Sequence, residues 1–133
     1  MRYRIAAQPA LVGLLCLLAA PAMAEDAKIN PLMAKDLAGL AGKEGTVLTV
    51  EYAPGGSSAK HKHNAHTFVY VLEGTIVMQG EGGEAVTLGA GQTFYESPDD
   101  IHTVSKNASH SQPAKFLVFF VKEKGAPLVV PVP

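Results

Sequence analysis

Four histidines of this chain have the spacing expected of metal ligands. His61, His63 and His66 stand within six consecutive residues, and His102 lies in a later segment. Alternate side chains of a β-strand share a face, so His61 and His63 point the same way. Two imidazoles so placed can reach one ion at about 2.0–2.1 Å, the nitrogen–metal distance typical of zinc sites. His102 follows a turn into a later β-forming segment, so we expect it to be the third ligand.

A plainer interpretation of the cluster is a solvated loop. The histidines are flanked by lysines and follow a glycine–serine-rich stretch, and short histidine tracts can bind metal only loosely. His110 lies in the polar stretch 108–112 with no neighbouring ligand, so we expect it to be exposed.

The elements that must position these histidines are short β-strands. Glycine and proline turns separate several β-branched or apolar segments, which is typical of an all-β sandwich or barrel. The last segment is nearly continuously apolar, as expected for a buried strand. The expected strands are 46–52, 67–72, 75–79, 85–88, 92–96, 101–105 and 115–121. The sequence thus predicts one small all-β domain.

Two flanking segments are less regular. Residues 25–43 form a lead-in whose leucines suggest either a short helical turn or an edge strand. Residues 123–133 form a tail with three prolines, which excludes a central strand because proline lacks the N–H that pairing requires. We expect the tail to lie along a sheet edge or on a partner subunit.

The first 24 residues resemble a secretory signal peptide. Arg2 and Arg4 precede the apolar run 10–20, and Ala22-Met23-Ala24 supplies small residues for cleavage after Ala24. The apolar run is short for a stable membrane span, although an uncleaved anchor is the alternative. We therefore predict a periplasmic or secreted protein that is free of the membrane after cleavage.

Cleavage would leave a slightly acidic chain without cysteine. Nine lysines stand against twelve acidic residues, a net charge of −3, and no basic stripe is present. Nucleic acid and anionic membrane surfaces are therefore not expected partners. Without disulfides, the domain must depend on its core or on a bound metal for stability.

The spacing of these residues resembles the two motifs of the cupin superfamily. In the first, Gly55 is followed after five residues by His61-x-His63, and then by Thr67 and Gly74. In the second, His102 follows Gly91 by eleven residues, whereas Pro98 is displaced by one position, Asp100 replaces a glycine and Asn107 comes one residue late. The resemblance covers about residues 44–122 and implies a small antiparallel β-barrel of the jelly-roll type with a metal in its mouth.

One departure from the motif concerns the metal ligands. Thr67 occupies the position of the family's metal-binding glutamate, and its hydroxyl is a poor ligand at neutral pH. We favour His66 as the replacement, which would need a bulge at Asn64-Ala65 because strand parity otherwise turns it away. Glu96 is the alternative source of a carboxylate. If neither His66 nor Glu96 reaches the metal, three imidazoles would bind it and leave coordination positions open for water or substrate.

Several functions fit the resemblance. The first is an enzyme, an oxygenase or isomerase that uses iron, manganese, copper, nickel or zinc on a small organic compound, with Glu96 and Tyr70 as candidate proton-transfer groups. The second is a non-catalytic module that binds a small molecule or a metal, and the third is a barrel that the metal merely stabilises. The resemblance also implies a homodimer, and strand 115–121 would suit pairing at a sheet edge.

Overall fold

The computed structural model describes residues 27–133, which form two packed antiparallel sheets. The predicted signal peptide lies outside the described residues. Within residues 27–133 no helix is long and apolar enough to cross a membrane. The all-β, single-domain prediction is confirmed.

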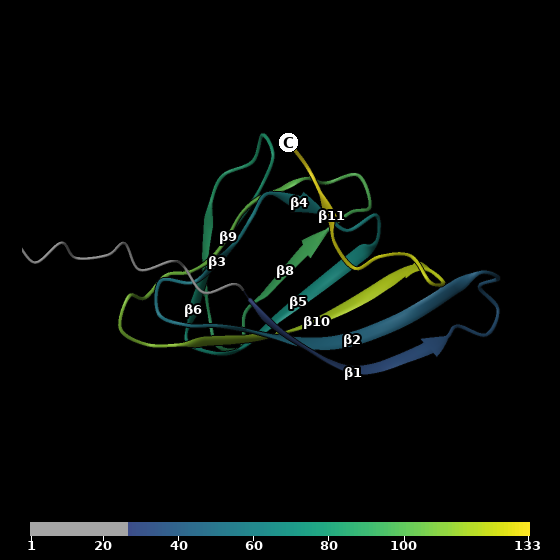
Figure 1. The fold of residues 1–133 in the computed structure, drawn as a ribbon, viewed down its shortest axis with the longest axis horizontal. Coiled ribbons are helices and arrows are strands. Elements are labelled where there is room, and N and C mark those ends of the chain that lie inside the picture. The colour runs from purple at the N-terminus through teal and green to yellow at the C-terminus, as the bar shows by residue number, and fades with distance from the viewer. Residues whose placement is uncertain (1–26) are drawn as a thin grey trace, which may run out of the picture.

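The first sheet has five strands in the order β1-β2-β10-β5-β8 (Figure 1). Their bounds are β1 Lys28–Asp36, β2 Lys43–Tyr52, β5 His66–Glu73, β8 Thr93–Glu96 and β10 Ala114–Glu123. The second sheet has the order β11-β4-β9-β6-β7, with β3 also paired to β9. Its strands are β3 Ser57–Ser58, β4 His61–Lys62, β6 Thr75–Gly80, β7 Val86–Gly89, β9 His102–Asn107 and β11 Val130–Pro131.

The core follows from strict alternation along the strands. In β10, alternate side chains starting at Ala114 are buried, and in β5 the same holds for Thr67, Val69 and Val71. These inward rows meet between the sheets, and their apolar members form the core together with Leu48, Val50, Tyr52, Ile76, Met78 and Leu88. Burial thus alternates along β5 and β10 although both sequences are nearly continuously apolar, and the apolar side chains of Phe68, Tyr70 and Leu72 lie on the outer face of β5.

Both flanking segments of the sequence join the sheets at their edges. Of the two alternatives for the lead-in, the structure has the edge strand: β1 pairs with β2, its residues are all exposed, and its register shifts between Pro31 and Met33. The tail contributes β11, which pairs with β4 at the edge of the second sheet.

The structure corrects the expectation that strand 115–121 lies free at an edge. This segment belongs to β10, which is hydrogen-bonded to β2 on one side and to β5 on the other. Its backbone is therefore not available for pairing with a second subunit. The homodimer stays a prediction without that support.

A sharp corner carries the chain from the second sheet to the first. Asn64 has a φ of 49°, the left-handed conformation that asparagine tolerates better than most residues. Ala65 behind it is buried, so positions 61, 63, 65, 67 and 69 face inward from β4 into β5. The corner thus turns the chain without shifting the parity of the side chains.

Candidate metal centre

His61, His63 and His102, the three histidines predicted to bind metal, come together on the inner side of the strands. His61 in β4 lies opposite His102 in β9 in the hydrogen-bonded ladder. His63 follows at the corner before β5. One ring nitrogen from each lies within 4.8 Å of the others, which makes the trio a possible metal site.

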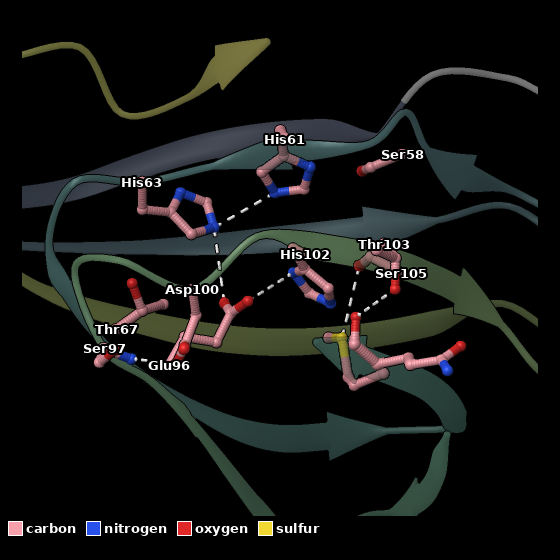
Figure 2. Close-up of polar contacts among 12 residues, drawn as sticks. Ser58, His61, His63, Thr67, Glu96, Ser97, Asp100, His102, Thr103 and Ser105 are labelled. Carbon is pink, nitrogen blue, oxygen red and sulfur yellow. Dashed lines mark hydrogen bonds and ion pairs between the residues drawn. The ribbon is translucent and has the colours of Figure 1, made fainter. Parts of the chain in front are cut away.

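Glu96 brings a carboxylate to the same place from the first sheet. It ends β8, and its side chain is 4% exposed. Its Oε1 lies 3.1 Å from His102 Nδ1, and its Oε2 lies 3.7 Å from His63 Nε2. Figure 2 shows Glu96 and the three imidazoles pointing toward one another.

The spacing of these atoms matches ligands of one ion. Two atoms about 2.1 Å from the same metal are about 3.0 Å apart at a right angle and about 3.4 Å apart at the tetrahedral angle. His61 Nε2 and His63 Nε2 are 3.2 Å apart. This distance and the two contacts of Glu96 lie close to those expected values, whereas the three ring nitrogens as a set lie within 4.8 Å of one another, so the imidazoles would close in on a bound ion.

Backbone carbonyls fix the proton positions on two of the rings. His61 Nδ1 lies 2.7 Å from the carbonyl of Ala59, and His63 Nδ1 lies 2.6 Å from that of Leu128. A carbonyl can only accept, so each Nδ1 carries the proton and donates it. In the neutral rings, both Nε2 lone pairs then face each other, an arrangement that a shared cation would stabilise.

Four buried polar atoms in the cluster have no hydrogen bond. They are both carboxylate oxygens of Glu96 and both ring nitrogens of His102; their 3.1 Å approach lacks hydrogen-bond geometry. Such groups are uncommon in folded proteins because each costs about 1–3 kcal/mol. Coordination to a metal would satisfy them, so the residues present fit a divalent transition ion.

Burial shifts the ionisation of these groups. Desolvation, with a smaller contribution from neighbouring histidines, lowers the pKa of His102 to about 4, and burial lowers the pKa of His63 to about 4 as well. These two imidazoles are therefore neutral near pH 7, the form that binds metal. Burial also raises the pKa of Glu96 to about 7, with a smaller contribution from Asp100. A cation in the site would favour the ionised carboxylate.

The structure does not bring His66 into this cluster, which corrects our preferred replacement for the glutamate. No bulge reverses the parity at Asn64-Ala65, so His66 points to the outer face of β5. There its Nδ1 forms a 2.7 Å hydrogen bond with the Tyr95 hydroxyl. His110 is exposed, as expected.

The structure also places the two remaining candidate site residues, Tyr70 and Thr67. Tyr70 is 46% exposed on the outer face of β5 and takes no part in the cluster, which contradicts its assignment as a proton-transfer group. Thr67 is buried and points inward, and its backbone pairs with that of Glu96 across β5 and β8. Glu96 thus places a carboxylate beside position 67, where the cupin motif has its glutamate.

A cavity of about 350 Å³ opens beside the four side chains. This volume is at the small end of the range for ligand pockets. Its walls are mostly apolar and come from both sheets and from the tail. The apolar lining includes Ala27, Leu48, Val50, Val69, Met78, Phe116, Val118, Phe120, Leu128 and Val129.

A second polar group in the cavity lining consists of three hydroxyls. Tyr52 lies 2.6 Å from Ser58 Oγ and 2.7 Å from Ser105 Oγ. Ser58 pairs with Ser105 as His61 pairs with His102, and a register shift in β9 between these two positions leaves both Ser105 and His102 buried on the inner side. Figure 2 shows Ser58 and Ser105 beyond His102, on the side away from Glu96. The mostly apolar cavity therefore has polar groups at two places.

Sequence reasoning did not single out these hydroxyls or the Leu128 carbonyl. The alternation along residues 46–52 places Tyr52 on the inward face, so its position was available from the pattern. Ser58, Ser105 and Leu128 gain their place only from strand pairing, for which the sequence carries no local signal.

Comparison with known proteins defines the class of this fold and site. Residues 48–120, more than half of the chain, match the Cupin_2 family, described as the cupin domain. The chain belongs to this cupin family. A search of curated proteins gave no significant match.

Solved structures with the same fold include proteins of different kinds. A cupin superfamily protein from Desulfitobacterium hafniense DCB-2 is 15% identical, with a TM-score of 0.61, over 91% of this chain and 100% of that one. An oxalate oxidase in complex with the substrate analogue glycolate is 22% identical, with a TM-score of 0.60, over 78% and 54%. A DMSP lyase from Ruegeria pomeroyi DSS-3 is 20% identical, with a TM-score of 0.56, over 65% and 42%. The match thus spans less than half of the lyase. At these identities the likeness concerns the fold.

Proposed function

We propose that this chain is a metal-dependent cupin enzyme that acts on a small organic compound. One divalent transition ion would be held by His61, His63, His102 and Glu96. The observation that carries the proposal is the convergence of buried donor atoms, four of them without hydrogen bonds, beside a mostly apolar cavity. A site that served stability alone would need no such cavity.

The charge and shape of the site define the ligand. Three neutral imidazoles and one carboxylate leave a divalent ion with a net charge of about +1, which favours a chelating oxygen anion. When bound, iron, manganese, copper, nickel or zinc would supply Lewis acidity, and iron or copper also electron exchange. The apolar walls exclude water and accept a hydrocarbon body.

The three hydroxyls would receive a polar group at the far end of the ligand. The Ser105 hydroxyl donates to Met78 Sδ at 3.4 Å. Tyr52 would therefore donate to Ser105 and Ser58 to Tyr52, which leaves the Ser58 lone pairs to accept from a donor in the cavity. We therefore propose a compound with two chelating oxygens at one end, an apolar middle and a hydroxyl at the other.

A non-catalytic binding module is the second candidate. In the described part of the chain, the only other ionisable residues in the cavity lining are Tyr52 and Lys60, and Lys60 is paired with Glu81 at 3.2 Å. A reaction that needs a separate general base would find none there. This observation favours capture of a ligand without turnover.

The direct test loads the metal-free protein separately with Fe(II), Mn(II), Cu(II), Ni(II) and Zn(II). Each form is titrated with glycolate, catechol and 4-(hydroxymethyl)catechol while oxygen uptake and products are followed. Saturable binding with turnover supports the enzyme, and saturable binding without turnover on any metal supports the module. Absence of binding to every loaded form contradicts both.

Tyr52→Phe is expected to weaken binding of 4-(hydroxymethyl)catechol to the loaded protein roughly five-fold while leaving catechol binding and metal content unchanged. The reason is the loss of one hydrogen-bonding hydroxyl, worth about 1 kcal/mol. Tyr70→Phe is the matched control, because that hydroxyl lies on the outer face. Equal weakening of both catechols by Tyr52→Phe would show that the hydroxyl cluster has only a structural role.

A further inference from the structure

The C-terminal tail passes directly over the metal centre. In β11, Val130 pairs with Lys62 and Pro131 pairs with His61, so the tail forms the outermost strand beside a predicted ligand. Figure 1 shows the end of the chain (yellow) running past β4. Leu128, Val129 and Pro131 also line the cavity. The tail is thus a wall of the site as well as an edge of the sheet.

One backbone atom of the tail acts on a ligand. The Leu128 carbonyl accepts the Nδ1 proton of His63 at 2.6 Å, across 65 residues of sequence. This hydrogen bond fixes both the tautomer and the ring orientation, and it leaves Nε2 facing His61 and Glu96. Phe120 packs against the same ring, with centroids 4.9 Å apart.

Several other polar contacts hold the tail. Lys122 Nζ donates to the Ala126 carbonyl at 2.7 Å, before the tail reaches the site. Beyond it, β11 pairs with β4, the Val132 N–H donates to the Lys60 carbonyl at 3.4 Å, and Lys60 Nζ donates to the Pro133 carbonyl at 3.5 Å. Among these attachments, the Leu128 carbonyl is the one whose partner is the side chain of a predicted metal ligand.

We propose that residues 127–133 form a strap whose docking is coupled to metal binding, with the Leu128 carbonyl as the positioning group for His63. This inference rests on the proposed metal site. The strap holds His63 Nε2 ready for the ion, and linkage requires that the ion hold the strap in return. Hydrogen-bond partners of a ligating histidine typically contribute about 10–100-fold to metal affinity.

Two nested truncations test the strap with Zn(II) as the probe and a competing chelator as the reporter. A chain that ends after Pro127 lacks the Leu128 carbonyl and is expected to bind zinc about 10–100-fold more weakly. A chain that ends after Pro131 keeps that carbonyl and β11 and is expected to bind within about three-fold of the full chain. Zinc affinities equal to that of the full chain in both truncations would overturn the strap. Absence of zinc binding by the full chain would instead overturn the proposed function.

A second measurement keeps the full chain intact, in case the shorter truncation fails to fold. Hydrogen exchange at the Val132 amide is expected to slow by about ten-fold or more when zinc binds. In His63→Ala, zinc is expected to leave this exchange rate unchanged. If zinc binds to the full chain and leaves Val132 exchange unaltered, the coupling is wrong.

Discussion

Replacing His102 with alanine is expected to lower the affinity for a divalent transition ion by about 100-fold or more, because it removes a ligand rather than a partner of one. The metal-free variant should still fold. The substitution removes two unsatisfied buried nitrogens, a relief of about 2–6 kcal/mol, and leaves a cavity with a cost of similar size. Metal titration against a chelator, beside a thermal melt without metal, measures both effects.

The matched control for this variant is His66→Ala. His66 has the same chemistry and stands in the same sequence cluster, but it faces the Tyr95 hydroxyl on the other side of β5. Its replacement is expected to leave metal affinity unchanged. A loss of similar size in both variants would mean that the cluster binds metal as a loose histidine tract and that the geometry described above is incorrect.

Moving the carboxylate from Glu96 to position 67 is expected to preserve the metal site. Thr67 and Glu96 are directly paired in the ladder between β5 and β8, and both are buried on the inner face. Glu96→Thr alone should weaken metal binding by about 100-fold or more, because it removes a ligand and the only carboxylate of the set. Adding Thr67→Glu should restore affinity to within about ten-fold of the unaltered protein, since a carboxylate returns beside the same imidazoles.

The two single variants and the double variant form a double-mutant cycle in which metal affinity is measured. Thr67→Glu alone places two carboxylates side by side, and their repulsion should destabilise the metal-free protein. Full metal affinity in Glu96→Thr would remove Glu96 from the ligand set. Failure of the double variant to regain affinity, while it remains folded, would show that position 67 cannot reach the ion.

Local sequence patterns were sufficient to predict β2, β5 to β10 and three of the candidate ligands, but not the short strands β3, β4 and β11. Alternation from Val47 to Tyr52 reflects the two faces of a strand, and this periodicity survives folding because one face is buried. The H-x-H spacing predicted two ligands on one face for the same reason, because alternate side chains of a strand share a face. Strand parity already argued against His66 as a ligand. The prediction of His66 relied on a bulge at Asn64 and Ala65, and the structure has no such bulge.

The remaining parts of the site depend on pairing between distant strands. Glu96 reaches the histidines because β8 lies beside β5, a neighbour relation that no local pattern encodes. The same holds for the Leu128 carbonyl, which offers no side-chain signal. Strand 115–121 was correctly predicted as buried, but an apolar segment does not reveal whether its edges are paired, and both edges of β10 are.

The central claim is that three imidazoles and the Glu96 carboxylate bind one ion. X-ray absorption at the zinc edge, on the full chain loaded with one equivalent of Zn(II), measures this set most directly. We predict three imidazole nitrogens and a carboxylate oxygen at about 2.0–2.2 Å, with one imidazole lost in His102→Ala and the carboxylate lost in Glu96→Thr. An ion surrounded by water oxygens alone, or a fourth imidazole that disappears in His66→Ala, would contradict the account.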